Sequence, residues 1–136
     1  MNDKVFLDTN VLIYSIDNRN PAKKASAISL LEGENEVMIS TQVIGEFVPA
    51  TVKKGVFTFE QAAVRANGFM QAMVVSQIGT STILKAFDIK RRYGFAYFDC
   101  LIAATALESN CRLLYSEDLH HGQVVDTLTV INPFVG

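Results

Sequence analysis

Short runs of apolar, often β-branched residues alternate along the chain with longer segments that carry helix start and stop signals. The short runs are apolar on both faces, which is typical of strands in a parallel sheet that is covered on both sides. We expect five such strands, at residues 5–7, 37–39, 77–79, 112–115 and 128–131. The pattern therefore predicts an α/β fold with a central parallel five-stranded sheet and helices on both faces.

The intervening segments are predicted to be helical from their boundary residues. Asn20 followed by Pro21 is a favoured helix start, and Gly33 is a favoured stop. Thr58 and Gln61 have the spacing of a capping box. The last helical segment is apolar almost all the way round, which indicates a buried central helix. We expect helices at residues 21–32, 41–54, 58–76, 82–93 and 98–109.

The composition is that of one folded domain. The chain has 136 residues, 49% hydrophobic and 19% charged, so a disordered protein is excluded and residues 1–136 are expected to form a single domain. Every apolar run stops well short of the about 18 residues that span a membrane, and the N-terminus lacks a basic signal-peptide region. Cys100 and Cys111 lie too far apart along a helix to form a disulfide, which suits a reducing compartment. We therefore predict a cytoplasmic protein without a membrane span.

Four acidic residues stand out by their positions. Asp8 follows the first predicted strand and Asp118 follows the fourth, so both are expected at the sheet edge where parallel strands end and ligands bind. Asp99 begins the buried helix, and Glu46 has apolar neighbours on the helix after the second strand. Singly, Asp99 could be a helix-dipole carboxylate, Asp118 a turn residue and Glu46 a solvent-facing residue. Asp8 is harder to explain in this way, because a strand rarely ends on a buried acid.

If the four carboxylates converge, their repulsion must be neutralised. Two like charges about 4 Å apart repel by about 4 kcal/mol at an effective dielectric constant of about 20. Several such pairs would offset much of a typical domain stability of about 5–15 kcal/mol. The carboxylates must therefore share protons or hold a divalent cation. Oxygen ligands without cysteine or an obligatory histidine favour Mg²⁺ or Mn²⁺, and such centres serve phosphodiester displacement.

Four segments resemble, in order, the motifs of PIN-domain ribonucleases, and more narrowly those of VapC-type toxins. They are FLDTNVLIY at residues 6–14, IGEF at 44–47, FDCLIAATA at 98–106 and LYSEDL at 114–119. A single DTN triplet is weakly specific, whereas the four segments together are strongly specific. The resemblance spans the chain from Val5 to Phe134.

The resemblance implies a PIN domain with one acidic Mg²⁺ or Mn²⁺ pocket. Its catalytic and metal-binding acids map onto Asp8, Glu46, Asp99 and Asp118, and its polar supporting positions onto Asn10 and Ser116. The implied activity is metal-dependent endoribonuclease cleavage of single-stranded regions of RNA, such as tRNA or another structured RNA, leaving 5′-phosphates. The implied partners are this RNA, a second copy in a homodimer and a small antitoxin protein that blocks the active site.

Attraction to RNA must be local, because 12 basic and 14 acidic residues leave a net charge of −2. Candidate RNA contacts are Lys53, Lys54, Lys85, Arg91, Arg92 and His120. A solvated helix end is an equally good interpretation of the basic residues. We interpret His120 and His121 as loop or RNA-facing residues rather than metal ligands, and Glu117 as a solvated turn residue.

Other functions are compatible with only parts of the sequence. A haloacid-dehalogenase-type phosphatase also has an aspartate after its first strand, but it needs a second acid two residues later, where this chain has Asn10. The sequence has no glycine-rich phosphate-binding loop, which argues against nucleotide-cofactor chemistry. Two alternatives stay open: a non-toxin PIN nuclease in RNA processing or DNA cleavage, and a non-catalytic PIN module that binds RNA or protein.

Overall fold

A six-stranded sheet forms the centre of the structure, a computed structural model that describes residues 3–135. The strand order is β3-β2-β1-β4-β6-β5, and all neighbouring strands are parallel except β5 and β6. The strands are β1 (Lys4–Leu7), β2 (Glu36–Ser40), β3 (Val74–Ser76), β4 (Leu113–Tyr115), β5 (Val124–Val125) and β6 (Leu128–Ile131). The predicted α/β class with a largely parallel sheet is confirmed.

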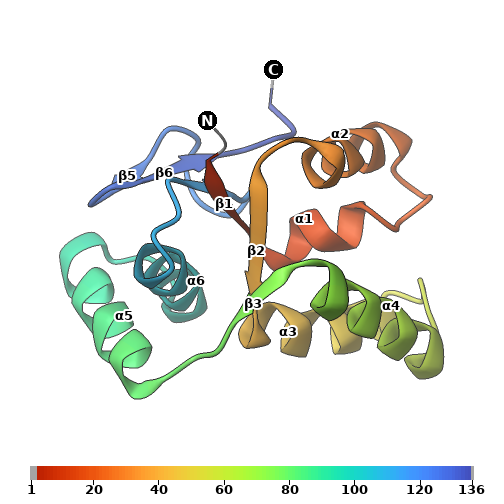
Figure 1. Ribbon diagram of the computed structural model, residues 1–136, viewed down its shortest axis with the longest axis horizontal. Coiled ribbons are helices and arrows are strands. Elements are labelled where there is room, and N and C mark those ends of the chain that lie inside the picture. The colour runs from red at the N-terminus through yellow and green to blue at the C-terminus, as the bar shows by residue number, and fades with distance from the viewer. Residues whose placement is uncertain (1–2, 136) are drawn as a thin grey trace.

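Six helices connect the strands and cover both faces of the sheet (Figure 1). They are α1 (Thr9–Tyr14), α2 (Pro21–Glu32), α3 (Thr41–Lys53), α4 (Phe59–Ala72), α5 (Thr80–Tyr93) and α6 (Tyr97–Glu108). The connections through α1–α2 and α3–α4 move toward one edge of the sheet, and the connection through α5–α6 moves back. Crossover connections between parallel strands are right-handed, so connections that move toward opposite edges of the sheet place their helices on opposite faces. Accordingly, α5 and α6 lie together on one side of the strands and α1 to α4 on the other.

Local capping explains where several helices begin. The Asn20 side chain accepts a hydrogen bond from the backbone N–H of Lys23 at the start of α2, and Gly33 caps its end. Both hydrogen bonds of the predicted capping box between Thr58 and Gln61 are present at the start of α4. These helix starts follow from the sequence because the capping partners lie within three residues of each other.

The number of strands and the position of one strand differ from the prediction. The sheet has six strands rather than five, because β5 forms a hairpin with β6 through a turn at Asp126, whose φ is 53°. A two-residue strand is too short to produce a recognisable pattern. The strand expected at residues 77–79 lies at β3 instead, because α4 ends at Ala72 rather than near residue 76. Val74 and Val75 then pair with Met38 and Ile39 of β2, a tertiary contact that overrides the helical pattern.

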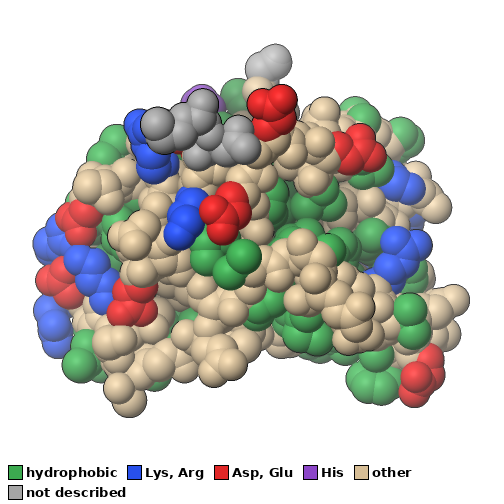
Figure 2. All heavy atoms as spheres, in the orientation of Figure 1, with side chains coloured by type: hydrophobic (Ala, Val, Ile, Leu, Met, Phe, Trp, Pro, Cys, Tyr) green, Lys and Arg blue, Asp and Glu red, His purple; other side chains and the backbone are tan. Residues whose placement is uncertain are grey.

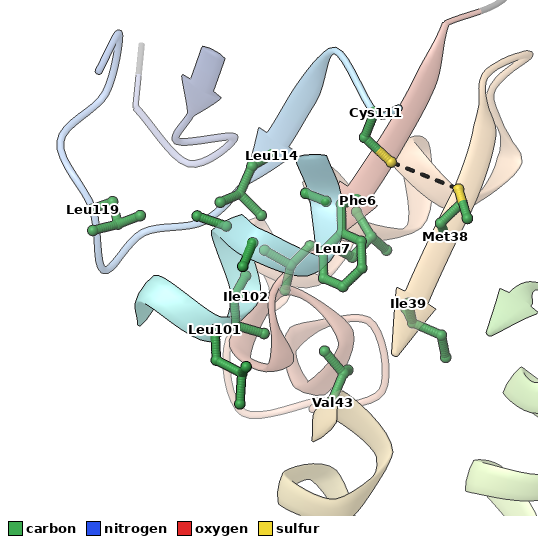
Figure 3. Packing of buried hydrophobic residues seen from close by; sticks show 14 of the residues in the cluster. Phe6, Leu7, Met38, Ile39, Val43, Leu101, Ile102, Cys111, Leu114 and Leu119 are labelled. Atoms are coloured by element: carbon green, nitrogen blue, oxygen red, sulfur yellow. Dashed lines mark hydrogen bonds between the residues drawn. The ribbon is translucent and has the colours of Figure 1, made fainter. Parts of the chain in front are cut away.

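The main core lies between the sheet and its helices (Figure 3). Phe6, Leu7 and Leu114 from the two central strands are fully buried, and because consecutive strand residues face opposite ways, Phe6 and Leu7 pack on opposite faces of the sheet. Residues 100–106 of α6 are all buried, which confirms the expected central helix. Cys111 is buried as a free thiol that donates a hydrogen bond to the Met38 sulfur at 3.6 Å, and burial raises its pKa to about 11. Among residues 3–135, no helix has the length and apolarity to cross a bilayer.

Candidate functional site

The candidate site lies where the direction of the crossovers reverses. β1 pairs with β2 on one side and with β4 on the other, so the helices from these two connections diverge at the carboxyl ends of β1 and β4. Such a switch point leaves a crevice in an open parallel sheet. The register pairs Leu7 with Tyr115, and the Asp8 N–H donates a hydrogen bond to the Tyr115 carbonyl at 3.0 Å. The residues that follow the two strands therefore enter the crevice side by side.

Three of the four predicted acids meet in this crevice. Asp8, Asp99 and Asp118 each offer a carboxylate oxygen, and these atoms all lie within 4.8 Å of one another. They come from the end of β1, the first turn of α6 and the loop after β4. Asp8 is only 6% exposed, Asp99 is partly buried and Asp118 is exposed. The arrangement concentrates negative charge at one end of the sheet.

Asp8 is held in place through both carboxylate oxygens. The Ser116 hydroxyl donates to Oδ2 at 2.7 Å, and the backbone N–H of Thr9 donates to Oδ1 at 2.7 Å. Ser116 Oγ in turn accepts the backbone N–H of Asp118 at 3.1 Å. Ser116 thus joins two of the clustered aspartates, which is the kind of supporting contact predicted for it.

Burial and like charges make ionisation of the clustered acids unfavourable. Burial raises the pKa of Asp8 to about 7, and the charges of Asp118 and Asp99 add to the increase despite the two hydrogen bonds. Burial also raises the pKa of Asp99, with further contributions from the charges of Asp118 and Glu46. A bound cation would remove this penalty, because it favours the charged forms.

Glu46 lines the same cavity but lies outside the cluster of three aspartates. It is exposed on α3, and its Oε1 accepts hydrogen bonds from the Thr9 hydroxyl at 3.1 Å and from Gln42 Nε2 at 3.2 Å. The cavity, called the acid cavity below, has a volume of about 150 Å³. It is lined by Asp8, Thr9, Asn10, Gln42, Glu46, Ala50, Phe98, Asp99, Ile102 and Asp118.

Two polar residues of the acid cavity, Thr9 and Gln42, were not identified from the sequence. Thr9 lies between Asp8 and Asn10, and it contributes its backbone to one acid and its hydroxyl to another. Gln42 precedes Glu46 by four residues, the spacing at which helical side chains meet, and this spacing could have identified it. Asn10 is placed in the cavity wall as expected, and its supporting role stays a prediction.

Glu117 is not the solvated turn residue expected from the sequence. Its carboxylate accepts hydrogen bonds from the Tyr14 hydroxyl at 2.8 Å and from Lys23 Nζ at 2.9 Å. Lys23 Nζ also lies over the rings of Tyr14 and Phe134, 4.6 and 5.3 Å from their centroids. These contacts attach the loop that carries Asp118 to α1 and α2.

The candidate RNA contacts fall into two groups. Lys85 and Arg92 on α5 form ion pairs with Asp126 at 2.9 and 2.8 Å and also pair with Asp88. Figure 2 shows basic and acidic side chains interspersed over this helix. Contact with phosphate would have to displace these acids. The other candidates, all exposed, are Lys53, Lys54, Arg91 and His120.

The residues of the acid cavity fit a hard divalent cation. Its described lining contains four carboxylates and no lysine or arginine, so protein groups do not neutralise the clustered charge. Carboxylate oxygens without sulfur ligands suit Mg²⁺ or Mn²⁺ rather than zinc. The cluster of Asp8, Asp99 and Asp118 would supply the ligands. Glu46 lines the same cavity and could serve as a further ligand or as a base.

Comparisons with known proteins agree with this architecture. The family model of the PIN domain matches residues 5–126. No curated protein sequence matches the chain significantly.

Solved structures with the same fold include a toxin–antitoxin complex, a DNA-bound VapBC and a VapC toxin. A toxin–antitoxin complex from Klebsiella pneumoniae is similar with a TM-score of 0.70 and 17% identity, over 95% of this chain and 97% of that chain. DNA-bound VapBC from Salmonella typhimurium has a TM-score of 0.68 and 20% identity, over 96% and 97%. VapC20 of Mycobacterium tuberculosis, a Sarcin-Ricin loop cleaving toxin, has a TM-score of 0.66 and 19% identity, over 84% and 89%. At these identities the likeness concerns the fold.

Proposed function

The chain belongs to the PIN domain family, and from this premise we propose that it is a Mg²⁺- or Mn²⁺-dependent endoribonuclease, the toxin of a type II toxin–antitoxin pair. One observation carries the proposal: Asp8, Asp99 and Asp118, far apart in sequence, bring carboxylate oxygens within 4.8 Å of one another at the switch point of the sheet. An uncompensated cluster of this kind is the donor set that phosphodiester hydrolysis by divalent metal requires.

In this proposal the three aspartates hold the cation, and Glu46 serves as a further ligand or as the base that acts on water. Asp8, Asp99 and Asp118 would be the ligands, and Ser116 and the Thr9 N–H keep the Asp8 carboxylate in one orientation. A bound Mg²⁺ or Mn²⁺ lowers the pKa of its water and neutralises charge that develops on the phosphate. As the base, Glu46 would accept a proton from the attacking water. The water oxygen would bond to phosphorus as the bond between phosphorus and the 3′ oxygen breaks, and the 3′ oxygen would take up a proton from solvent, which leaves a 5′-phosphate and a 3′-hydroxyl.

The proposed substrate and partners rest on the structural neighbours. VapC20 is described as cleaving the Sarcin-Ricin loop, which supports a single-stranded region of a structured RNA as the substrate here. Several similar structures are toxin–antitoxin complexes, which supports a small antitoxin that covers the acid cavity. We further propose a homodimer in the cytoplasm, and contacts to RNA through the exposed Lys53, Lys54, Arg91 and His120.

Cleavage assays with a matched pair of variants test the proposal. Purified protein is incubated with total tRNA and with labelled single-stranded DNA, in Mn²⁺ or in EDTA. We expect RNA cleavage that requires Mn²⁺, is lost in Asp99→Asn and persists in Asp88→Asn, since Asp88 lies on α5 in ion pairs with Lys85 and Arg92.

Other results would point elsewhere. Cleavage of DNA alone would favour a DNA nuclease. RNA cleavage that survives both EDTA and Asp99→Asn would contradict the proposed centre, and intact RNA and DNA throughout would favour a binding module.

A further inference from the structure

The side chain of Gln42 connects two walls of the acid cavity. Gln42 is the second residue of α3, and its Nε2 donates to Glu46 Oε1 at 3.2 Å and to the backbone carbonyl of Phe98 at 3.2 Å. Phe98 is the second residue of α6 and directly precedes Asp99. One amide group therefore joins the helix that carries Glu46 to the turn that carries Asp99.

The orientation of this amide follows from the chemistry of its neighbours. A glutamine amide has two N–H donors on nitrogen and only acceptors on oxygen. The carboxylate of Glu46 and the carbonyl of Phe98 are both acceptors, so only the nitrogen can face them. Oε1 then points elsewhere, and among the described residues it is the one buried side-chain nitrogen or oxygen without a hydrogen-bond partner. The contact is thus kept although it leaves a buried acceptor unsatisfied, which is unfavourable for folding.

The hydrogen bonds to Glu46 select one of its two oxygens. Thr9 Oγ1 donates to Oε1 at 3.1 Å, and Gln42 donates to the same atom. Among the described residues, both hydrogen bonds to Glu46 fall on Oε1, which leaves Oε2 for a ligand. Because Glu46 is exposed on its helix, its long side chain would otherwise sample several rotamers.

Glu46 and Asp99 carry like charges, so their helices need a link that opposes repulsion. Both carboxylates line the acid cavity, where their negative charges repel each other. The Gln42 amide is such a link, because it donates to Glu46 and to the turn of Asp99 at once. A neutral donor between two acidic elements stabilises their approach without cancelling the charge that attracts a cation.

We propose that Gln42 is a positioning residue, which orients Glu46 and holds it at the Asp99 turn so that the acid cavity is preorganised for a divalent cation. The inference rests on the proposed function only in naming that cation. Substitution of groups that orient metal ligands typically lowers metal affinity or activity by about 10- to 100-fold.

The test measures Mn²⁺ affinity by titration calorimetry without RNA, together with the thermal midpoint in EDTA. Gln42→Met keeps the length of the side chain and removes its donors, and Gln71→Met on the exposed face of α4 is the matched control. For Gln42→Met we expect an Mn²⁺ affinity lower by about 10-fold or more. We expect its midpoint in EDTA to be no lower than that of Gln71→Met, because the unsatisfied oxygen is removed as well.

Thr9 provides a second pair of variants. Thr9→Val removes the hydroxyl at nearly constant shape and Thr9→Ser retains it, so Mn²⁺ affinity should fall in the first and be kept in the second. Equal affinities in Gln42→Met and Gln71→Met would overturn the inference. So would a loss of affinity in Gln42→Met that comes with an equal loss of stability in EDTA, since that pattern denotes a structural role.

The same data separate this inference from the proposed function. Wild-type protein that binds Mn²⁺ but cuts no RNA would contradict the proposed nuclease activity. The comparison of Gln42→Met with Gln71→Met would still test the inference. Metal-dependent RNA cleavage with unchanged affinity in Gln42→Met would contradict the inference alone. Wild-type protein that binds no Mn²⁺ would contradict both.

Discussion

Asp8 is expected to destabilise the metal-free protein at neutral pH, although it lies at the centre of the site. The residue is 6% exposed, and its pKa is raised from 3.8 to about 7 by burial and by the charges of Asp118 and Asp99. Below pH 3.8 the group is protonated in both the folded and the unfolded chain, so it does not lower the free energy of unfolding. Between pH 3.8 and 7 the unfolded chain releases the proton while the folded protein retains it, so the free energy of unfolding falls as pH rises.

The size of the effect follows from the two pKa values. At about 1.4 kcal/mol per pKa unit, the full penalty is about 4 kcal/mol above pH 7 and about 1.6 kcal/mol at pH 5. Asn at position 8 has no charge and similar shape, and it can accept from the Thr9 N–H and donate to Ser116 Oγ. Asp8→Asn should therefore stabilise the protein in EDTA at pH 8, by up to about 4 kcal/mol. The gain should shrink by more than half at pH 5.

Urea unfolding in EDTA at pH 5 and pH 8 measures this difference, with Asp88→Asn as the exposed control. Mn²⁺ should narrow this difference in stability at pH 8. The wild type gains about 2.7 kcal/mol at a ligand concentration of 100 times Kd, and the variant has lost a ligand. An Asp8→Asn variant that is no more stable than wild type at pH 8, or whose gain is the same at both pH values, would refute the reasoning.

Three further predictions concern the residues around the site and the core. Ser116→Ala removes the hydroxyl that donates to Asp8, so Mn²⁺ affinity measured by calorimetry should fall by about 10- to 100-fold. Leu114→Ala opens a cavity beneath the site and should lower the free energy of unfolding by about 2–5 kcal/mol in urea; a loss below 1 kcal/mol would contradict the packing described. Arg92→Ala breaks exposed ion pairs to Asp126 and Asp88, so the free energy of unfolding measured in urea should fall by only about 0–1 kcal/mol.

Local features of this fold could be predicted from the sequence because their causes are local. The start of α2 at Asn20 and the capping box at Thr58 depend on hydrogen bonds that span three residues. The buried helix α6 is recognisable because its residues are apolar all round. The edges of the sheet were not predictable in this way. β3 and β5 consist of only three and two residues, too few to form a recognisable strand pattern, and they become strands through pairing with β2 and β6.

The candidate site likewise has features that follow from the sequence and features that only the tertiary structure determines. The types of the acidic residues, and the positions of Asp8 and Asp118 after strands, follow from the sequence, and they indicate which sheet edge carries the candidate site. The approach of Asp99 to them, the Thr9 and Gln42 donors on Glu46, and the pairing of Glu117 with Lys23 required the tertiary structure. A sequence pattern encodes backbone preference and burial, which act over a few residues. Which side chains meet across 37 or 94 residues is decided only when strand order and helix packing bring separate elements together.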